Sequence, residues 1–135
     1  MAYWRLYRTA GGNRIIHDEI TALDRIAFAA IFAAMDDVEE LGASAASAPV
    51  SDKIREIDAN GEHGTTFRLL FGKAGRNDQI LLAVVVFEKK TRKTPKRFID
   101  LAERRLDDWE SRQLPSPETP KKPAAKKKSA GNRSS

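Results

Sequence analysis

Six basic side chains lie within nine residues of the chain, at positions 89–97 (KKTRKTPKR). They directly follow an apolar run, Gln79–Phe87 (QILLAVVVF), which is typical of a strand buried on both faces. Clustered cations at a strand end can hold a phosphate group and stabilise negative charge that develops on it. Packing lysines together also disfavours each charged form and lowers its pKa toward neutrality, where it can transfer protons. The segment therefore predicts phosphate chemistry.

Arg68 is the second candidate for this chemistry. It stands between Phe67 and Leu69 in an alternating segment, Thr66–Lys73 (TFRLLFGK), so its side chain points away from both. If Phe67 and Leu69 pack in the core, Arg68 lies on an open face where a substrate would bind. We expect Lys90 to contact the phosphate, with Lys89 or Lys93 assisting. For each lysine alone, a solvated strand edge that prevents aggregation is the simpler explanation.

Carboxylates, histidines and threonines supply the other candidates. Glu56 could act as a base, or could only neutralise the cations around it. Thr91 and Thr94 could donate hydrogen bonds to phosphate, and Thr94 before Pro95 is equally suited to cap a helix. His63 lies in a glycine-flanked turn and is expected to have no role. The chain has no cysteine, and two histidines 46 residues apart form no recognisable ligand pattern, so we expect no metal and no cofactor.

The formal net charge of +5 is unevenly distributed. Residues 1–52 carry 4 basic and 8 acidic side chains, whereas residues 53–97 carry 11 basic and 5 acidic ones. Residues 113–135 add 6 basic side chains against 1 acidic one. A phosphate-rich partner is favoured by such clustering, although solubility alone also accounts for it.

The periodicity of apolar residues predicts an α+β fold, with helices against one face of a small antiparallel sheet. A strand is expected at Tyr3–Arg8 and a helical stripe at Ile16–Leu41, split near Thr21–Asp24 with Asp24 capping its second part. Residues 42–51 are expected to be a linker. Three strands joined by short hairpin turns should follow, at Lys53–Asp58, Thr66–Lys73 and Gln79–Phe87. A helix is then expected to begin at about Pro95–Lys96.

We expect residues 1–112 to form one domain and residues 113–135 to be a disordered Lys- and Pro-rich tail, because no apolar residue larger than alanine follows Leu114. The lysines of this tail either grip nucleic acid non-specifically or only improve solubility. The sequence has no N-terminal apolar segment after Met1 and no run long enough to span a bilayer, so a cytoplasmic location without membrane contact is expected.

The segment from Ile80 to Trp109 resembles the phage-derived branch of the RelE/HigB toxin superfamily. Members end their central strand in Phe-x-Lys-Lys-Thr-x-Lys-Thr-Pro, followed by a helix with an Ala-x-x-Arg pattern. The matching residues here are Phe87, Lys89, Lys90, Thr91, Lys93, Thr94, Pro95, Ala102 and Arg105. Phe67–Phe71 (FRLLF) and Trp4–Thr9 (WRLYRT) also look like segments of this branch, so that the similarity covers roughly residues 3–112.

The resemblance implies a RelE-like fold and the toxin of a type II toxin–antitoxin pair. Such toxins are endoribonucleases that cleave mRNA, commonly on the ribosome, and a cognate antitoxin, often with a helix-turn-helix domain, neutralises them. The site implied for this chain has Arg68, Lys90 and Glu56 as catalytic residues. The residues expected to bind RNA are Lys89, Lys93, Arg92, Arg55 and Thr91.

One position departs from the pattern of the superfamily. Where its earlier strand reads Leu-Tyr-Glu-Leu-Arg, this chain has Ile54–Asp58 (IREID), which retains Glu56 but places Asp58 at the arginine position. An acid there is expected to repel the substrate backbone. Two alternatives follow: a non-catalytic nucleic-acid-binding or regulatory protein on the same scaffold, or a relative that acts on DNA gyrase.

Overall fold

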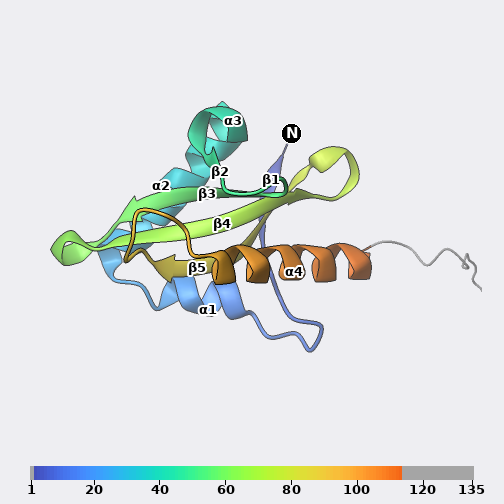
Figure 1. Cartoon of the computed structure of the whole chain (residues 1–135), viewed down its shortest axis with the longest axis horizontal. Coiled ribbons are helices and arrows are strands. Elements are labelled where there is room, and N and C mark those ends of the chain that lie inside the picture. Colours follow the sequence, from blue (N-terminus) through green and yellow to red (C-terminus); the bar gives the residue numbers. More distant parts are fainter. Residues whose placement is uncertain (1, 114–135) are drawn as a thin grey trace, which may run out of the picture.

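The computed structural model of the protein describes residues 2–113, which form an α+β fold (Figure 1). This confirms the predicted fold class. Two 3-10 turns, Glu62–Gly64 and Arg76–Asp78, lie within the hairpins of the sheet. The helices and strands are β1 (Tyr3–Leu6), α1 (Ile15–Thr21), α2 (Arg25–Leu41), α3 (Ala43–Ala46), β2 (Ala48–Pro49), β3 (Ile54–Asn60), β4 (Thr66–Ala74), β5 (Ile80–Glu88) and α4 (Lys96–Gln113).

The five strands form one mixed sheet in the order β1-β5-β4-β3-β2. The pairs β3–β4 and β4–β5 are antiparallel, as predicted. The unpredicted strand β2 also pairs antiparallel with β3, whereas β1 runs parallel to β5. The prediction of a purely antiparallel sheet was therefore wrong at one edge. No hairpin joins these two strands, because α1, α2 and three other strands lie between them in the chain, so their relative direction is not set by a turn.

Helices cover both faces of the sheet, which corrects the prediction that they lie on one face (Figure 1). On one face, the ring of Phe71 meets Trp4 at 4.9 Å between centroids, and the Trp4 indole donates to the carbonyl of Met35 on α2 at 2.8 Å. The next residue, Gly72, points to the other face, where a Cβ atom would lie 2.7 Å from Leu106 of α4. Leu81 to Val86 of β5 are all buried, as expected for a strand covered on both sides.

The helical stripe of the N-terminal half is divided where the sequence predicted. The carboxylate of Asp24 accepts a hydrogen bond from the backbone N–H of Ala27 at 2.8 Å and so caps α2. Ala27, Ile31, Met35 and Val38 then recur every three or four residues and bury one side of this helix.

Residues 42–51, expected to be a linker, contribute to the fold. Ala43 in the short helix α3 is buried, and β2 pairs with β3 at the edge of the sheet. Their small side chains permit close packing but carry no periodic pattern, which is why the sequence did not reveal them. Residues 113–135 were predicted to be disordered. Apart from the backbone of Gln113, these positions lie outside the described residues. Within residues 2–113, no helix has the length and apolar composition needed to cross a membrane.

Candidate functional site

Arg68 is the centre of a charged network between β3, β4 and the segment that leads into α4. Asp58 on β3 is its direct partner in the antiparallel register with β4. The guanidinium donates from Nε to Asp58 Oδ1 at 2.6 Å and from Nη2 to Asp58 Oδ2 at 3.0 Å. This two-point geometry is the one in which arginine binds a carboxylate most strongly.

The remaining side of the guanidinium binds the loop after β5. Arg68 Nη1 donates to the hydroxyl oxygen of Thr94 at 2.6 Å and to the backbone carbonyl of Arg92 at 3.3 Å. The Thr94 hydroxyl in turn donates to Glu56 Oε1 at 2.6 Å, and the same Glu56 oxygen lies 3.2 Å from Arg68 Nη1. Arg68 therefore ties this loop to both β3 and β4.

The face expected to be open at Arg68 is covered. Only 4% of Arg68 and 4% of Thr94 are exposed, and the ring of Phe87 at the end of β5 stacks on Phe98 of α4 at 4.1 Å between centroids. The loop and the first turn of α4 fold back over the sheet. Alternation of side chains along a strand cannot predict that this segment covers Arg68. With Asp58, Thr94 and the loop carbonyl as partners, the guanidinium has little capacity left for a substrate phosphate.

The charges in this network compensate one another. Hydrogen bonding from Arg68 lowers the pKa of Asp58 below its ordinary value of 3.8, despite the opposing effect of burial, and Lys89 Nζ at 3.3 Å from Asp58 Oδ2 acts in the same direction. The pKa of Arg68 is raised, chiefly by its hydrogen bond to Asp58. Asp58 is therefore ionised and shared by two cations. Together with Glu56, it balances the charges of Arg68 and Lys89. Asp58 therefore does not stand alone against a substrate, as the sequence had implied.

We call residues 89–95, between β5 and α4, the basic loop. Its first residue is held in the sheet, because the N–H of Lys89 donates to the carbonyl of Thr66 at 2.7 Å. Thr91 closes a tight turn by donating from its hydroxyl to the Lys93 carbonyl at 2.8 Å. The side chain of Lys90 is 74% exposed and lies 3.2 Å from Glu88, and Arg92 and Lys93 are exposed as well. The loop therefore presents three cations to solvent on a fixed backbone.

The structure brings most, but not all, of the predicted residues together. Arg68, Glu56 and Lys89 share the charged network, and Lys90, Thr91, Arg92 and Lys93 lie on the loop that it holds. Arg55 lies apart, because its side chain points to the α2 side of the sheet and donates to the Ser47 hydroxyl at 2.7 Å and the Ser47 carbonyl at 3.0 Å. His63 is 92% exposed in the β3–β4 turn.

Two members of the network were not recognised as such from the sequence. Asp58 was interpreted as a defect, and Thr94 as a cap or a phosphate ligand. The signal for Asp58 was present: Glu56 and Asp58 are two residues apart, so both face the same side of β3, and an antiparallel hairpin can place Arg68 opposite them. Thr94 had no comparable signal, because its partners depend on how the loop folds back.

Chemically, the arrangement is a rigid cationic loop above a neutralised, buried guanidinium. Such a loop can bind phosphate groups from solvent without reorganising, since its backbone is already fixed. The sequence profile of the proteins described as "Phage derived protein Gp49-like (DUF891)" matches residues 18–107, which contain the whole charged network and the basic loop. A comparison with curated proteins found no match.

Proposed function

Since the chain belongs to the Gp49-like family of phage-derived proteins, a RelE/HigB-like toxin family, we propose that it is the toxin of a type II toxin–antitoxin pair that cleaves mRNA on the ribosome. The observation that supports RNA as the substrate is the basic loop. Its Lys90, Arg92 and Lys93 are exposed to solvent, while the buried ion-pair network holds the backbone of the loop through the Arg92 carbonyl and Thr94.

The reaction we propose is attack by the 2′-hydroxyl of the RNA on the adjacent phosphorus. The 2′ oxygen loses a proton and bonds to phosphorus, the bond from phosphorus to the 5′ oxygen breaks, and that oxygen gains a proton. The products are a 2′,3′-cyclic phosphate and a 5′-hydroxyl. Lys90 contacts the phosphate and transfers protons, while Arg92 and Lys93 stabilise the negative charge that develops on it.

Arg68 and Glu56 act in this proposal as positioning residues. Arg68 fixes the loop through Thr94 and the Arg92 carbonyl, and Glu56 completes the bond to Thr94. Neither needs to touch the substrate. This division of roles explains how the chain could function with Asp58 where the superfamily pattern has an arginine, because Asp58 holds Arg68 in place.

A toxin–antitoxin family implies an antitoxin as partner. We propose that the cognate antitoxin carries a helix-turn-helix domain and is encoded beside this chain. Co-expression of the two should restore growth to cells that this chain alone arrests.

The test is inducible expression of the full chain in a bacterial host, with growth and the 5′ ends of cellular RNA measured together. The wild type should arrest growth and produce mRNA breaks with 5′-hydroxyl ends. Lys90→Ala should relieve both effects, because an exposed side chain can be removed without unfolding the protein. Arg76→Ala is the matched control, since it removes one exposed positive charge at the opposite end of β4.

Other outcomes would overturn the proposal in distinguishable ways. Arrest with altered DNA supercoiling and intact mRNA would assign the chain to DNA gyrase. Absence of arrest, with RNA binding retained in the purified protein, would support the non-catalytic alternative, which the compensation of Arg68 by two carboxylates favours. Arrest that Lys90→Ala leaves unchanged would refute the role given to the basic loop.

A further inference from the structure

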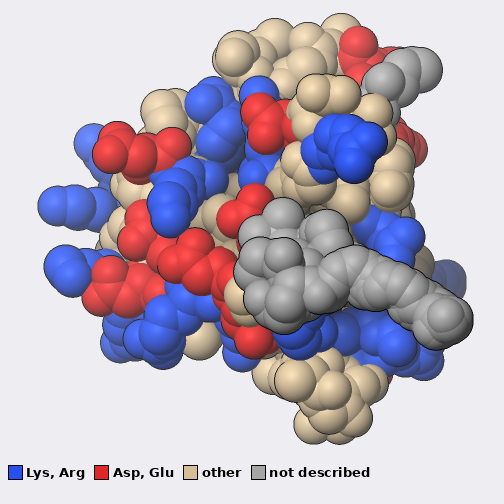
Figure 2. Space-filling model, turned by 90° about the vertical axis from the view of Figure 1, so that its right-hand side faces the viewer, with Lys and Arg blue, Asp and Glu red and all other residues tan. Residues whose placement is uncertain are grey.

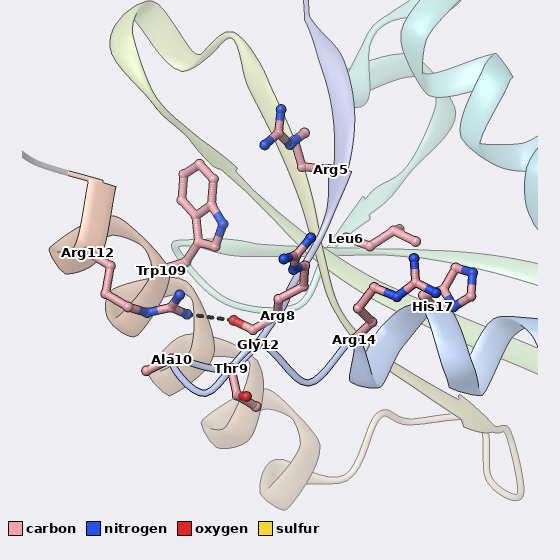
Figure 3. A pocket seen from close by; sticks show the side chains of 10 residues that line it. All are labelled: Arg5, Leu6, Arg8, Thr9, Ala10, Gly12, Arg14, His17, Trp109 and Arg112. Carbon is pink, nitrogen blue, oxygen red and sulfur yellow. Dashed lines mark hydrogen bonds between the residues drawn. The ribbon is translucent and has the colours of Figure 1, made fainter.

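A second cationic site lies at the other end of α4 (Figure 3). It is a pocket of about 590 Å³ between the end of β1, the segment that leads into α1 and the last turns of α4. Figure 3 shows side chains from all three elements around it. The lining residues are Arg5, Leu6, Arg8, Thr9, Ala10, Gly12, Arg14, His17, Trp109 and Arg112.

The lining is strongly positive. It includes four arginines and no carboxylate. Arg5, Arg8 and Arg14 are all exposed, and none of the three forms an ion pair within residues 2–113. These three are also three of the four basic residues in the net acidic segment 1–52, so the fold concentrates almost all the positive charge of that segment in one place.

Internal contacts hold the pocket in shape. Arg112 donates from Nη2 to the Arg8 carbonyl at 2.6 Å, which links α4 to the segment after β1 (Figure 3). The same nitrogen donates to Asp108 of α4 at 2.8 Å. The Tyr7 hydroxyl donates to the same Asp108 oxygen at 2.7 Å. Asp108 is therefore occupied by Tyr7 and Arg112, and does not neutralise the three other arginines.

The turn before α1 adds to this rigidity. The N–H of Gly12 donates to the Thr9 carbonyl at 2.9 Å, and Gly12 has a φ of 91°, a conformation that favours glycine. The turn therefore fixes the backbone between Arg8 and Arg14. Among the described residues, the one carboxylate that forms an ion pair or side-chain hydrogen bond with a lining side chain other than Arg112 is Asp18, whose Oδ1 lies 3.1 Å from His17 Nδ1.

The pocket is separate from the basic loop. α4 begins at Lys96, beside the loop, and the pocket residues of this helix are Trp109 and Arg112. At 1.5 Å per residue, the two sites lie about 20 Å apart along the helix. Every lining residue also falls outside the segment 18–107 that matches the family, so nothing in that match accounts for the pocket.

We propose that this pocket binds a phosphate-bearing ligand of nucleotide size, either a nucleotide within an RNA strand or a free nucleotide. Four arginines line this one pocket, and three of them, Arg5, Arg8 and Arg14, form no ion pair within residues 2–113. Arginines without carboxylate partners attract phosphate, and guanidinium groups bind it through paired hydrogen bonds. The volume lies within the range of about 300–1,000 Å³ that is usual for small-ligand sites. The buried indole of Trp109 provides an apolar wall for a base or sugar.

The experiment measures binding to the purified full chain by the fluorescence of Trp109, in a Trp4→Phe background that leaves Trp109 as the one remaining tryptophan. The probes are inorganic phosphate, adenosine monophosphate and a short single-stranded RNA. We expect saturable changes with the RNA, the nucleotide or both. In Arg8→Gln/Arg14→Gln the affinity should fall about tenfold or more, because two charged hydrogen-bond donors are lost. The slope of log K against log salt for RNA should also fall by about two.

Lys73→Gln/Arg76→Gln is the matched control, since it removes two exposed charges at the β4–β5 turn and should bind like the parent. Tight binding of RNA with weak binding of the mononucleotide would identify an RNA strand as the source of the phosphate, and equal binding would identify a free nucleotide. Equal affinity of the parent and Arg8→Gln/Arg14→Gln for every probe would overturn the proposal. Since the readout is binding, failure here leaves the growth and RNA-cleavage test unaffected.

Discussion

At the scale of the residue, Arg68 combines burial with full charge compensation. Its guanidinium is almost inaccessible, yet two carboxylates, a hydroxyl and a carbonyl surround it. A buried ion pair of this kind adds little net stability by itself, but removal of one partner leaves the other charge buried and uncompensated. Arg68 is therefore a residue whose loss should affect the fold first and any activity only as a consequence.

Arg68→Ala is expected to lower the free energy of unfolding by about 2–3 kcal/mol, below the usual range for a fully buried pair because Asp58 is partly exposed. The double variant Arg68→Ala/Asp58→Ala should recover part of this loss, since no unpaired carboxylate remains at position 58. Urea denaturation of Arg68→Ala, Asp58→Ala and the double variant measures the coupling between the two side chains. Strictly additive losses would show that the pair is not coupled.

The pH dependence of stability should carry the signature of Asp58. Its pKa in the folded protein is lowered from 3.8, so the stabilisation is present above that value and is lost as the pH falls through the folded pKa. Asp58→Asn should be less stable than the wild type at pH 7, and this difference should shrink below about pH 4. Thermal unfolding at both pH values tests this, and a difference that is constant with pH would contradict it.

At the scale of the element, α4 lies against the sheet where β4 has no side chain. A Cβ atom on Gly72 would lie 2.7 Å from Leu106 Cδ2 and 3.1 Å from the backbone carbonyl of Lys53. Gly72 thus allows the helix to approach closely. The helix in turn positions the end of the basic loop and one wall of the pocket lined by Arg5, Arg8, Arg14 and Arg112, which we call the arginine pocket.

Gly72→Ala should therefore destabilise the protein by about 1–3 kcal/mol, the usual cost of overpacking. The Leu106 side chain can move, but the Lys53 carbonyl cannot without disturbing β3. Equilibrium unfolding in urea measures the effect, with Lys73→Ala as an exposed neighbour on the same strand. A Gly72→Ala variant as stable as the wild type would show that α4 is not packed this closely.

At the scale of the whole molecule, positive charge is concentrated at separate sites. The face at the C-terminal end of α4 carries basic and acidic side chains next to one another over much of its surface (Figure 2). Against this mixed background, the basic loop and the pocket lined by four arginines stand out because each gathers more cations than carboxylates within one loop or one pocket lining. A strand of RNA held at the loop would need to extend about 20 Å along α4 to reach the pocket.

The sequence by itself determined the elements that depend on local patterns. The division of the N-terminal helices at Asp24, the three hairpin-connected strands, the burial of β5 on both faces and the start of α4 after Pro95 all follow from periodicity, capping and turn residues. The basic run after β5 was equally visible, because consecutive charges need no partner to be recognised.

Only the tertiary structure decided how distant segments meet. Three features involve residues separated by long stretches of chain: the parallel pairing of β1 with β5, the covering of Arg68 by the basic loop, and the pocket that Arg5, Arg8 and Arg14 line together with Arg112. Such contacts are set by the packing of whole elements against a shared core, and local propensity carries no information about them. The same physical reason turned Asp58 from an apparent defect in the sequence into the partner that holds Arg68.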